Sequence, residues 1–94
     1  MTKADQTTII NIVSKHLPKA KIYLFGSRAR KDHSSESDID IALDSNKKIE
    51  SYTLSLIKEE IEESTIPYTV DVVDVHSISE DLKKQILKDG ILWQ

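Results

Sequence analysis

Three aspartates stand where their carboxylates could act together. Residues 38–43 read Asp-Ile-Asp-Ile-Ala-Leu, and apolar residues that alternate with period two predict a strand with one buried face. Asp38 and Asp40 then share the opposite face, and the alternation within a later predicted strand, residues 68–75, lets Asp71 join them. Aspartate is depleted in strands and like charges on one face repel, so folding alone does not favour the cluster. A solvated strand edge would explain the first pair, whereas the third carboxylate favours a bound cation.

The predicted cation is a hard divalent metal ion. Carboxylate oxygens suit Mg²⁺ or Mn²⁺, and the chain contains no cysteine for a zinc site. His16, His33 and His76 have no ligand spacing between them and are expected at the surface. Asp74 lies three positions after Asp71 and so faces the other way, where we expect a solvated or capping aspartate. It remains the alternative to Asp71 as the third ligand.

A glycine-serine turn provides a candidate phosphate site. Gly26 ends a short apolar run rich in strand formers, residues 21–25, and the Ser-Arg-Ala-Arg segment after it could start a helix. A glycine lets a ligand approach the backbone, and a helix start directs free N–H groups at an anion. The Ser27 hydroxyl can donate to a phosphate oxygen, and Arg28 or Arg30 can neutralise its charge. Because most such turns are ordinary, this prediction depends on the aspartates that follow.

The remaining elements must position these residues around one small sheet. Apolar residues at helical spacing predict amphipathic helices over residues 7–17 and 49–63, and a short helix over 79–88. With the strands and the turn after Gly26, the order is helix, strand, helix, strand, helix, strand, helix. This order predicts an α/β (α+β) fold, in which a small mixed sheet carries helices on one face and leaves the other face for the site. The terminal Ile-Leu-Trp, residues 91–93, either packs on the sheet edge or is exposed for a partner.

Length and composition set the broad class. The chain has 94 residues, 38% of them hydrophobic and 31% charged, which predicts one globular domain over residues 1–94. Its apolar runs are far shorter than the roughly 20 residues that cross a bilayer, and the lack of cysteine fits a reducing cytoplasm. The net charge of −3 argues against a protein that binds nucleic acid mainly by neutralising phosphates.

Taken together, the motifs resemble those of a known family. Leu-Phe-Gly-Ser-Arg-Ala-Arg at 24–30, Ser-Asp-Ile-Asp at 37–40 and Val-Asp-Val-Val-Asp at 70–74 are similar to the DNA polymerase beta-type nucleotidyltransferase superfamily, and more narrowly to its minimal nucleotidyltransferase (MNT) branch. The resemblance implies a palm-like core that holds two divalent ions, Mg²⁺ or Mn²⁺, beside the phosphates of ATP. The implied catalytic and metal-binding residues are Asp38, Asp40 and Asp71, and the implied phosphate-binding residues are Gly26, Ser27 and Arg30. Arg28 stands at a variable position of the family pattern, and Lys31 stands where the family usually has glycine.

The resemblance also implies a reaction and a partner. MNT proteins typically pair with HEPN proteins, which are small helical ribonuclease toxins, and act as antitoxins by transferring AMP from ATP to a toxin tyrosine. Related enzymes that modify small molecules or extend RNA carry a second domain for the acceptor, so we expect a protein acceptor here. Two alternatives stay open: a noncatalytic protein that neutralises a partner by covering it, and nucleotidyl transfer to a small molecule or a nucleic-acid end.

Overall fold

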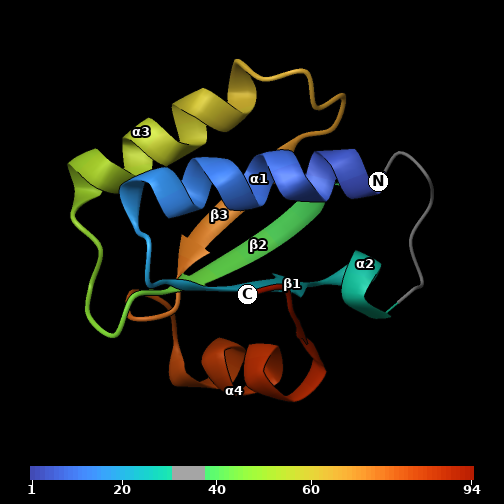
Figure 1. The fold of residues 1–94 in the computed structure, drawn as a ribbon. Coiled ribbons are helices and arrows are strands. Elements are labelled where there is room, and N and C mark those ends of the chain that lie inside the picture. The colour runs from blue at the N-terminus through green and yellow to red at the C-terminus, as the bar shows by residue number, and fades with distance from the viewer. Residues whose placement is uncertain (31–37) are drawn as a thin grey trace.

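The computed structural model describes residues 1–30 and 38–94 of the chain as four helices and one mixed sheet of four strands. The helices are α1 (Lys3–His16), α2 (Ser27–Arg30), α3 (Ser51–Glu62) and α4 (Glu80–Asp89), and the strands are β1 (Lys21–Phe25), β2 (Ile39–Asp44), β3 (Val70–Asp74) and β4 (Ile91–Leu92). The strand order is β3-β2-β1-β4, in which β2 and β3 are parallel and the other neighbours antiparallel (Figure 1). In these two ranges of residues, no helix is both long enough and apolar enough to span a bilayer.

The main core lies between the sheet and the helices α1 and α3. Ile39, Ile41 and Leu43 of β2 are fully buried in it, as their alternation predicts. Ile9 of α1 and Ile57 of α3 are also fully buried there. Burial of a large aliphatic side chain contributes about 1.5–3 kcal/mol. This layer therefore fixes which face of β2 its aspartates occupy.

Helix α1 begins earlier than residue 7, where the apolar periodicity starts. Thr2 and Asp5 form a capping box, in which the Thr2 hydroxyl accepts from the Asp5 N–H at 3.1 Å and the Asp5 carboxylate accepts from the Thr2 N–H at 3.2 Å. The first turn of the helix is polar, so it adds nothing to the apolar pattern. The capping box therefore determines that α1 starts at Lys3.

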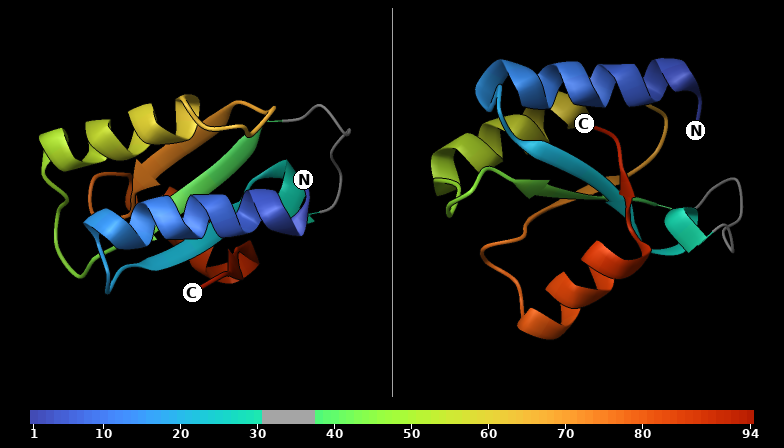
Figure 2. Two further views of the ribbon diagram at one scale, coloured as in Figure 1. Left: turned by 45° about the horizontal axis from the view of Figure 1, so that its top comes forward. Right: turned by 60° about the horizontal axis from the view of Figure 1, so that its bottom comes forward.

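Helix α4 packs on the second face of the sheet, opposite α1 and α3 (Figures 1 and 2). A smaller core there joins Ile86 of α4 to Ala42 of β2 and to Val75, with Phe25 of β1 packed against it. The expectation of helices on one face only is thus corrected. Apolar side chains lie on both faces of β1, so the second face also needs cover. The mixed α/β class itself is confirmed.

The terminal residues 91–93 belong to the sheet edge. Trp93 N–H donates to the Ile22 carbonyl oxygen at 2.7 Å, and Ile22 N–H donates to the Gln94 carbonyl oxygen at 3.0 Å. The Trp93 side chain packs against the main core. Both alternatives hold in part, because the main chain of this segment and the Trp93 side chain pack on the sheet edge while the side chains of Ile91 and Leu92 are exposed. The strand β4 has too few residues to show any periodicity in the sequence.

Candidate active site

Asp40 and Asp71 lie side by side across the β2–β3 pair. They are register partners in parallel strands, so both side chains project from the same face of the sheet. Phe25 of β1 is in turn the register partner of Asp40. A row of three residues, Phe25, Asp40 and Asp71, therefore crosses the sheet on the face opposite α1 and α3. Asp71 is exposed and Asp40 is half-buried.

Asp38 stands just outside this row. It immediately precedes β2, its side chain is exposed, and strand alternation puts it on the same side as Asp40. Over residues 1–30 and 38–94, no group of three or more histidine, cysteine or acidic side chains is arranged to hold a metal ion. The structure thus brings two of the three predicted carboxylates together. The participation of Asp38 stays a prediction.

Gly26 connects the predicted phosphate turn to Asp40. Its φ is +76°, in the left-handed region that favours glycine. A Cβ built on Gly26 would clash with Asp40 Oδ2 and lie 3.1 Å from Asp40 Cγ. The backbone conformation therefore favours glycine, and any side chain here would have to displace the Asp40 carboxylate. The turn and the aspartate row form one continuous site.

Arg28 is held inside the protein. The residue is 5% exposed, and its guanidinium carbon lies 4.6 Å from the centre of the Tyr68 ring. An arginine over an aromatic face makes a cation–π interaction, which strengthens when the pair is desolvated. This contact ties α2 to the segment that enters β3. From the sequence, Arg28 is expected only to neutralise the charge of a phosphate. Its contact with Tyr68 could not be predicted, because no spacing pairs the two residues.

The other two predicted phosphate-binding residues, Ser27 and Arg30, are the first and last residues of α2. Ser27 is the first residue of α2 and is half-buried directly after Gly26. The Arg30 side chain lies outside the described part of the structure, as do Lys31 and His33. Phosphate contacts by Ser27 and Arg30 therefore stay predictions.

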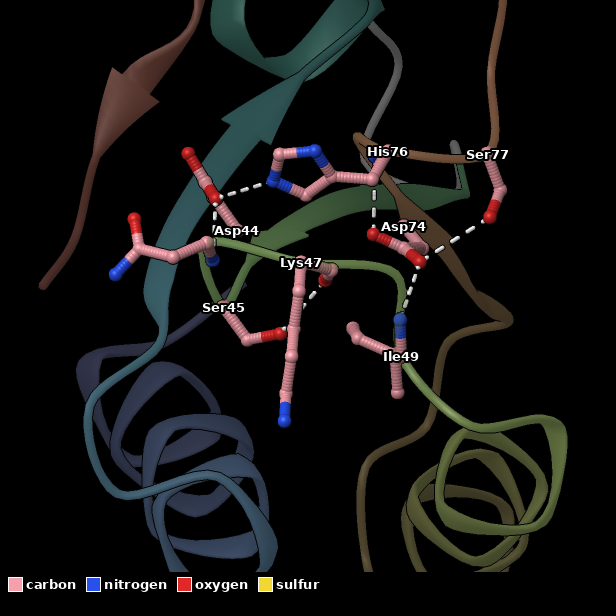
Figure 3. A network of polar contacts seen from close by, with 8 residues as sticks. Asp44, Ser45, Lys47, Ile49, Asp74, His76 and Ser77 are labelled. Atoms are coloured by element: carbon pink, nitrogen blue, oxygen red, sulfur yellow. Dashed lines mark hydrogen bonds and ion pairs between the residues drawn. The ribbon is translucent and has the colours of Figure 1, made fainter.

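Asp74 stabilises the fold, facing away from Asp71. Its carboxylate is buried, with the residue 2% exposed. It accepts hydrogen bonds from the Ile49 N–H at 2.8 Å, the His76 N–H at 3.0 Å and the Ser77 hydroxyl at 3.1 Å (Figure 3). The expectation of a capping aspartate is confirmed, and that of a solvated one is wrong. These bonds fix the Asp74 carboxylate at the end of β3. Asp71 is therefore the remaining candidate for the third metal ligand.

Two histidines pair with carboxylates away from the aspartate row. His76 Nε2 lies 2.9 Å from Asp44 Oδ1 (Figure 3), and His16 Nε2 lies 2.9 Å from Glu60 Oε2. Burial raises the pKa of Asp44, but hydrogen bonds from a backbone N–H and from His76, with nearby positive charge, together lower it. Hydrogen bonds from Lys15 and His16 lower the pKa of Glu60. Both histidines take part in surface pairs that stabilise the fold.

Comparison with known proteins shows which family the chain belongs to. Residues 7–93 match the family described as polymerase beta, nucleotidyltransferase. The chain belongs to this family. It is 30% identical over 93 residues to a Haemophilus influenzae protein named "Probable protein adenylyltransferase MntA", a match that covers 98% of this chain and 82% of that protein. It is also 30% identical over 95 residues to "Protein adenylyltransferase MntA" of Shewanella oneidensis, covering 99% of this chain and 68% of that protein.

Solved structures of toxin–antitoxin complexes share the nucleotidyltransferase fold. One, determined with AMP-PNP, has a TM-score of 0.78 at 28% identity and covers 93% of this chain and 70% of that chain. Another holds a tri-AMPylated Shewanella oneidensis HEPN toxin in complex with an MNT antitoxin. Its TM-score is 0.75 at 27% identity, and the match covers 98% of this chain and 71% of that chain. The resemblance to the MNT branch of the nucleotidyltransferases is confirmed.

Proposed function

We propose that this protein transfers AMP from ATP to a tyrosine hydroxyl of a HEPN-type toxin and acts in this way as an antitoxin. Relatives named protein adenylyltransferase and a similar complex with an AMPylated HEPN toxin support the proposal. Within this chain, the observation that carries it is the close approach of Gly26 to Asp40. That contact sets a turn suited to phosphates against a pair of carboxylates suited to metal ions.

The donor set fits divalent ions of the Mg²⁺ or Mn²⁺ type. Asp40 and Asp71 are neighbours on one face and offer hard oxygen ligands, and a cation relieves the repulsion between their charges. We assign Asp38 to the same set, so that three carboxylates would hold two ions. When bound, such ions neutralise the charge of the triphosphate and lower the pKa of the acceptor hydroxyl.

The chain's own residues orient the reactants. The N–H groups at the start of α2 and the Ser27 hydroxyl bind the phosphates that leave, with Arg30 adding positive charge. The acceptor oxygen bonds to the α-phosphorus while the bond from that phosphorus to the pyrophosphate oxygen breaks. Asp71, exposed on the same face of the sheet as Asp40, takes the hydroxyl proton as general base. The partner contributes by holding its hydroxyl in line, since orientation removes much of the barrier.

A transfer assay tests the proposal directly. The protein is incubated with Mg²⁺, ATP labelled at the α-phosphate and a HEPN toxin encoded beside it, and the toxin is mapped for labelled tyrosine. Asp71→Asn should slow labelling by at least roughly 100-fold, the lower end for loss of a general base. Asp81→Asn, on the exposed first turn of α4, is the matched control and should label normally. Equal labelling by Asp71→Asn and wild type would refute the assignment.

A further inference from the structure

A small pocket lies between α4 and the end of β1, on the face of the aspartate row. Its volume is about 160 Å³, and its lining residues are Phe25, Gly26, Leu82, Gln85, Ile86 and Asp89. Two of them connect it to the candidate active site: Phe25 is the register partner of Asp40, and Gly26 closely approaches the Asp40 carboxylate. The pocket therefore adjoins that site on the side of α4.

The pocket is lined by both apolar and polar residues. Phe25, Leu82 and Ile86 belong to the smaller core, and Ile86 is 1% exposed. Gln85 and Asp89 are exposed at the rim. Apolar walls with a few polar groups that fix orientation are typical of sites for small organic ligands. A flat ring with hydrogen-bonding groups along one edge suits this lining.

The charge of the pocket disfavours phosphate. Asp89 is the last residue of α4, so its carboxylate lies at the negative end of the helix dipole. A neutral group that donates hydrogen bonds, such as an exocyclic amino group, is better suited to this end of the site than a phosphate is.

The size of the pocket limits the occupant to part of a nucleotide. Sites that enclose a whole drug-sized ligand measure about 300–1,000 Å³, and this pocket is about 160 Å³. One ring system fits this scale. The rest of the nucleotide would then lie next to Gly26 and Asp40.

We propose that this pocket binds the base of the nucleoside triphosphate, with Gln85 and Asp89 selecting adenine over guanine. The inference rests on the proposed nucleotidyl transfer and adds its base specificity. A glutamine amide can pair with adenine by one donor and one acceptor contact along the N6 and N7 edge. Asp89 accepts from the same amino group, whereas guanine presents a carbonyl oxygen there and is repelled by the carboxylate.

Equilibrium titration with three probes tests the pocket. The probes are ATP, GTP and inorganic tripolyphosphate, each with Mg²⁺. Gln85→Trp fills the pocket and should weaken ATP binding by roughly tenfold or more while tripolyphosphate binding stays unchanged. Gln85→Leu keeps the bulk but loses the amide, so it should reduce the preference for ATP over GTP. Lys84→Trp, exposed on the same helix outside the lining, is the matched control and should bind ATP as the wild type does.

The outcomes separate this inference from the proposed function. Gln85 is exposed, so its variants should fold, and circular dichroism melts verify this. Unchanged ATP affinity in folded Gln85→Trp would overturn the base pocket while leaving the transfer reaction in place. A wild-type protein that binds neither ATP nor tripolyphosphate would overturn both.

Discussion

At the scale of single residues, Gly26 links the phosphate turn to the aspartate row, because the Asp40 carboxylate lies against it. Its φ of +76° disfavours any residue with a side chain, and a Cβ would clash with the Asp40 carboxylate. We expect Gly26→Ala to lower the free energy of unfolding by about 1–2 kcal/mol from the backbone conformation alone. The clash adds to this loss. Urea denaturation measures the total.

The double variant Gly26→Ala/Asp40→Ala separates the two causes. Without the Asp40 carboxylate the new methyl group has room. The Asp40→Ala substitution should therefore cost less stability in the Gly26→Ala background than in the wild type. Strictly additive effects would show that the two residues do not interact.

For Asp71 we expect a substitution to leave the free energy of unfolding unchanged or to raise it, in contrast with Gly26. It is exposed beside Asp40, so metal-free Asp71→Asn should match the wild type or gain about 0.2–1 kcal/mol as a like-charge pair is removed. Mg²⁺ and ATP bind only the folded state and so raise the wild-type melting temperature, and the variant should lose most of that rise. Melting curves with and without Mg²⁺ and ATP give both quantities. A melting temperature well below wild type without metal would instead indicate a structural role.

At the scale of elements, the strand carrying the aspartates is the part that the sequence predicts best. Ile39, Ile41 and Leu43 alternate, and burial of that face leaves Asp40 on the other. Parity in β3 likewise puts Asp71 on the second face, where the register confirms it. Both predictions follow from a local period of two, which needs no knowledge of tertiary contacts.

Contacts between elements that are far apart in the sequence are harder to predict from a local pattern. An apolar stripe shows that α4 buries one side, but not which face of the sheet it covers. Of the three hydrogen bonds to Asp74, those from His76 and Ser77 are local and fit the capping role that the sequence predicts. The third comes from Ile49 in the β2–α3 connection, 25 residues away, and no spacing predicts it. Arg28 stacks on Tyr68 across a long stretch of sequence. The side of the sheet that α4 covers, the Ile49–Asp74 hydrogen bond and the Arg28–Tyr68 contact all depend on tertiary packing.

The Arg28–Tyr68 contact gives a prediction about how α2 is anchored. Tyr68→Leu should destabilise the protein by about 0.5–2 kcal/mol through loss of the aromatic face, whereas Tyr68→Phe keeps the ring and should lose little. A double-mutant cycle with Arg28→Met, followed by urea denaturation, isolates the coupling. If phenylalanine destabilised as much as leucine, the ring face would not be what Arg28 recognises.

At the scale of the whole molecule, acid should weaken the fold through paired carboxylates. The pKa values of Asp44 and Glu60 are lowered from their ordinary values of 3.8 and 4.5. A carboxylate with a lowered folded-state pKa contributes stability above its unfolded pKa and loses that contribution as pH falls through the folded value. Stability should therefore hold at neutral pH and fall in acid, below the ordinary pKa of these groups.

His76→Ala tests the part of this loss that belongs to Asp44. The variant removes a hydrogen bond and a positive charge that lower the pKa of Asp44. Urea midpoints measured at neutral and acidic pH should then show a smaller acid-induced loss than in the wild type. Identical pH profiles for the two proteins would remove the His76–Asp44 pair from the explanation.

The central claim for the protein and its partner is that the toxin is neutralised by chemistry rather than by coverage. Asp38 is exposed just before β2, so Asp38→Asn should fold and should still form the complex. Growth of cells that express the HEPN-type toxin together with wild type, Asp38→Asn or the control Asp81→Asn tests the claim most directly, with co-purification to verify the complex. We predict that wild type and Asp81→Asn restore growth, while Asp38→Asn binds the toxin without restoring growth. Full protection by Asp38→Asn would contradict catalysis and support a protein that neutralises its partner by binding alone.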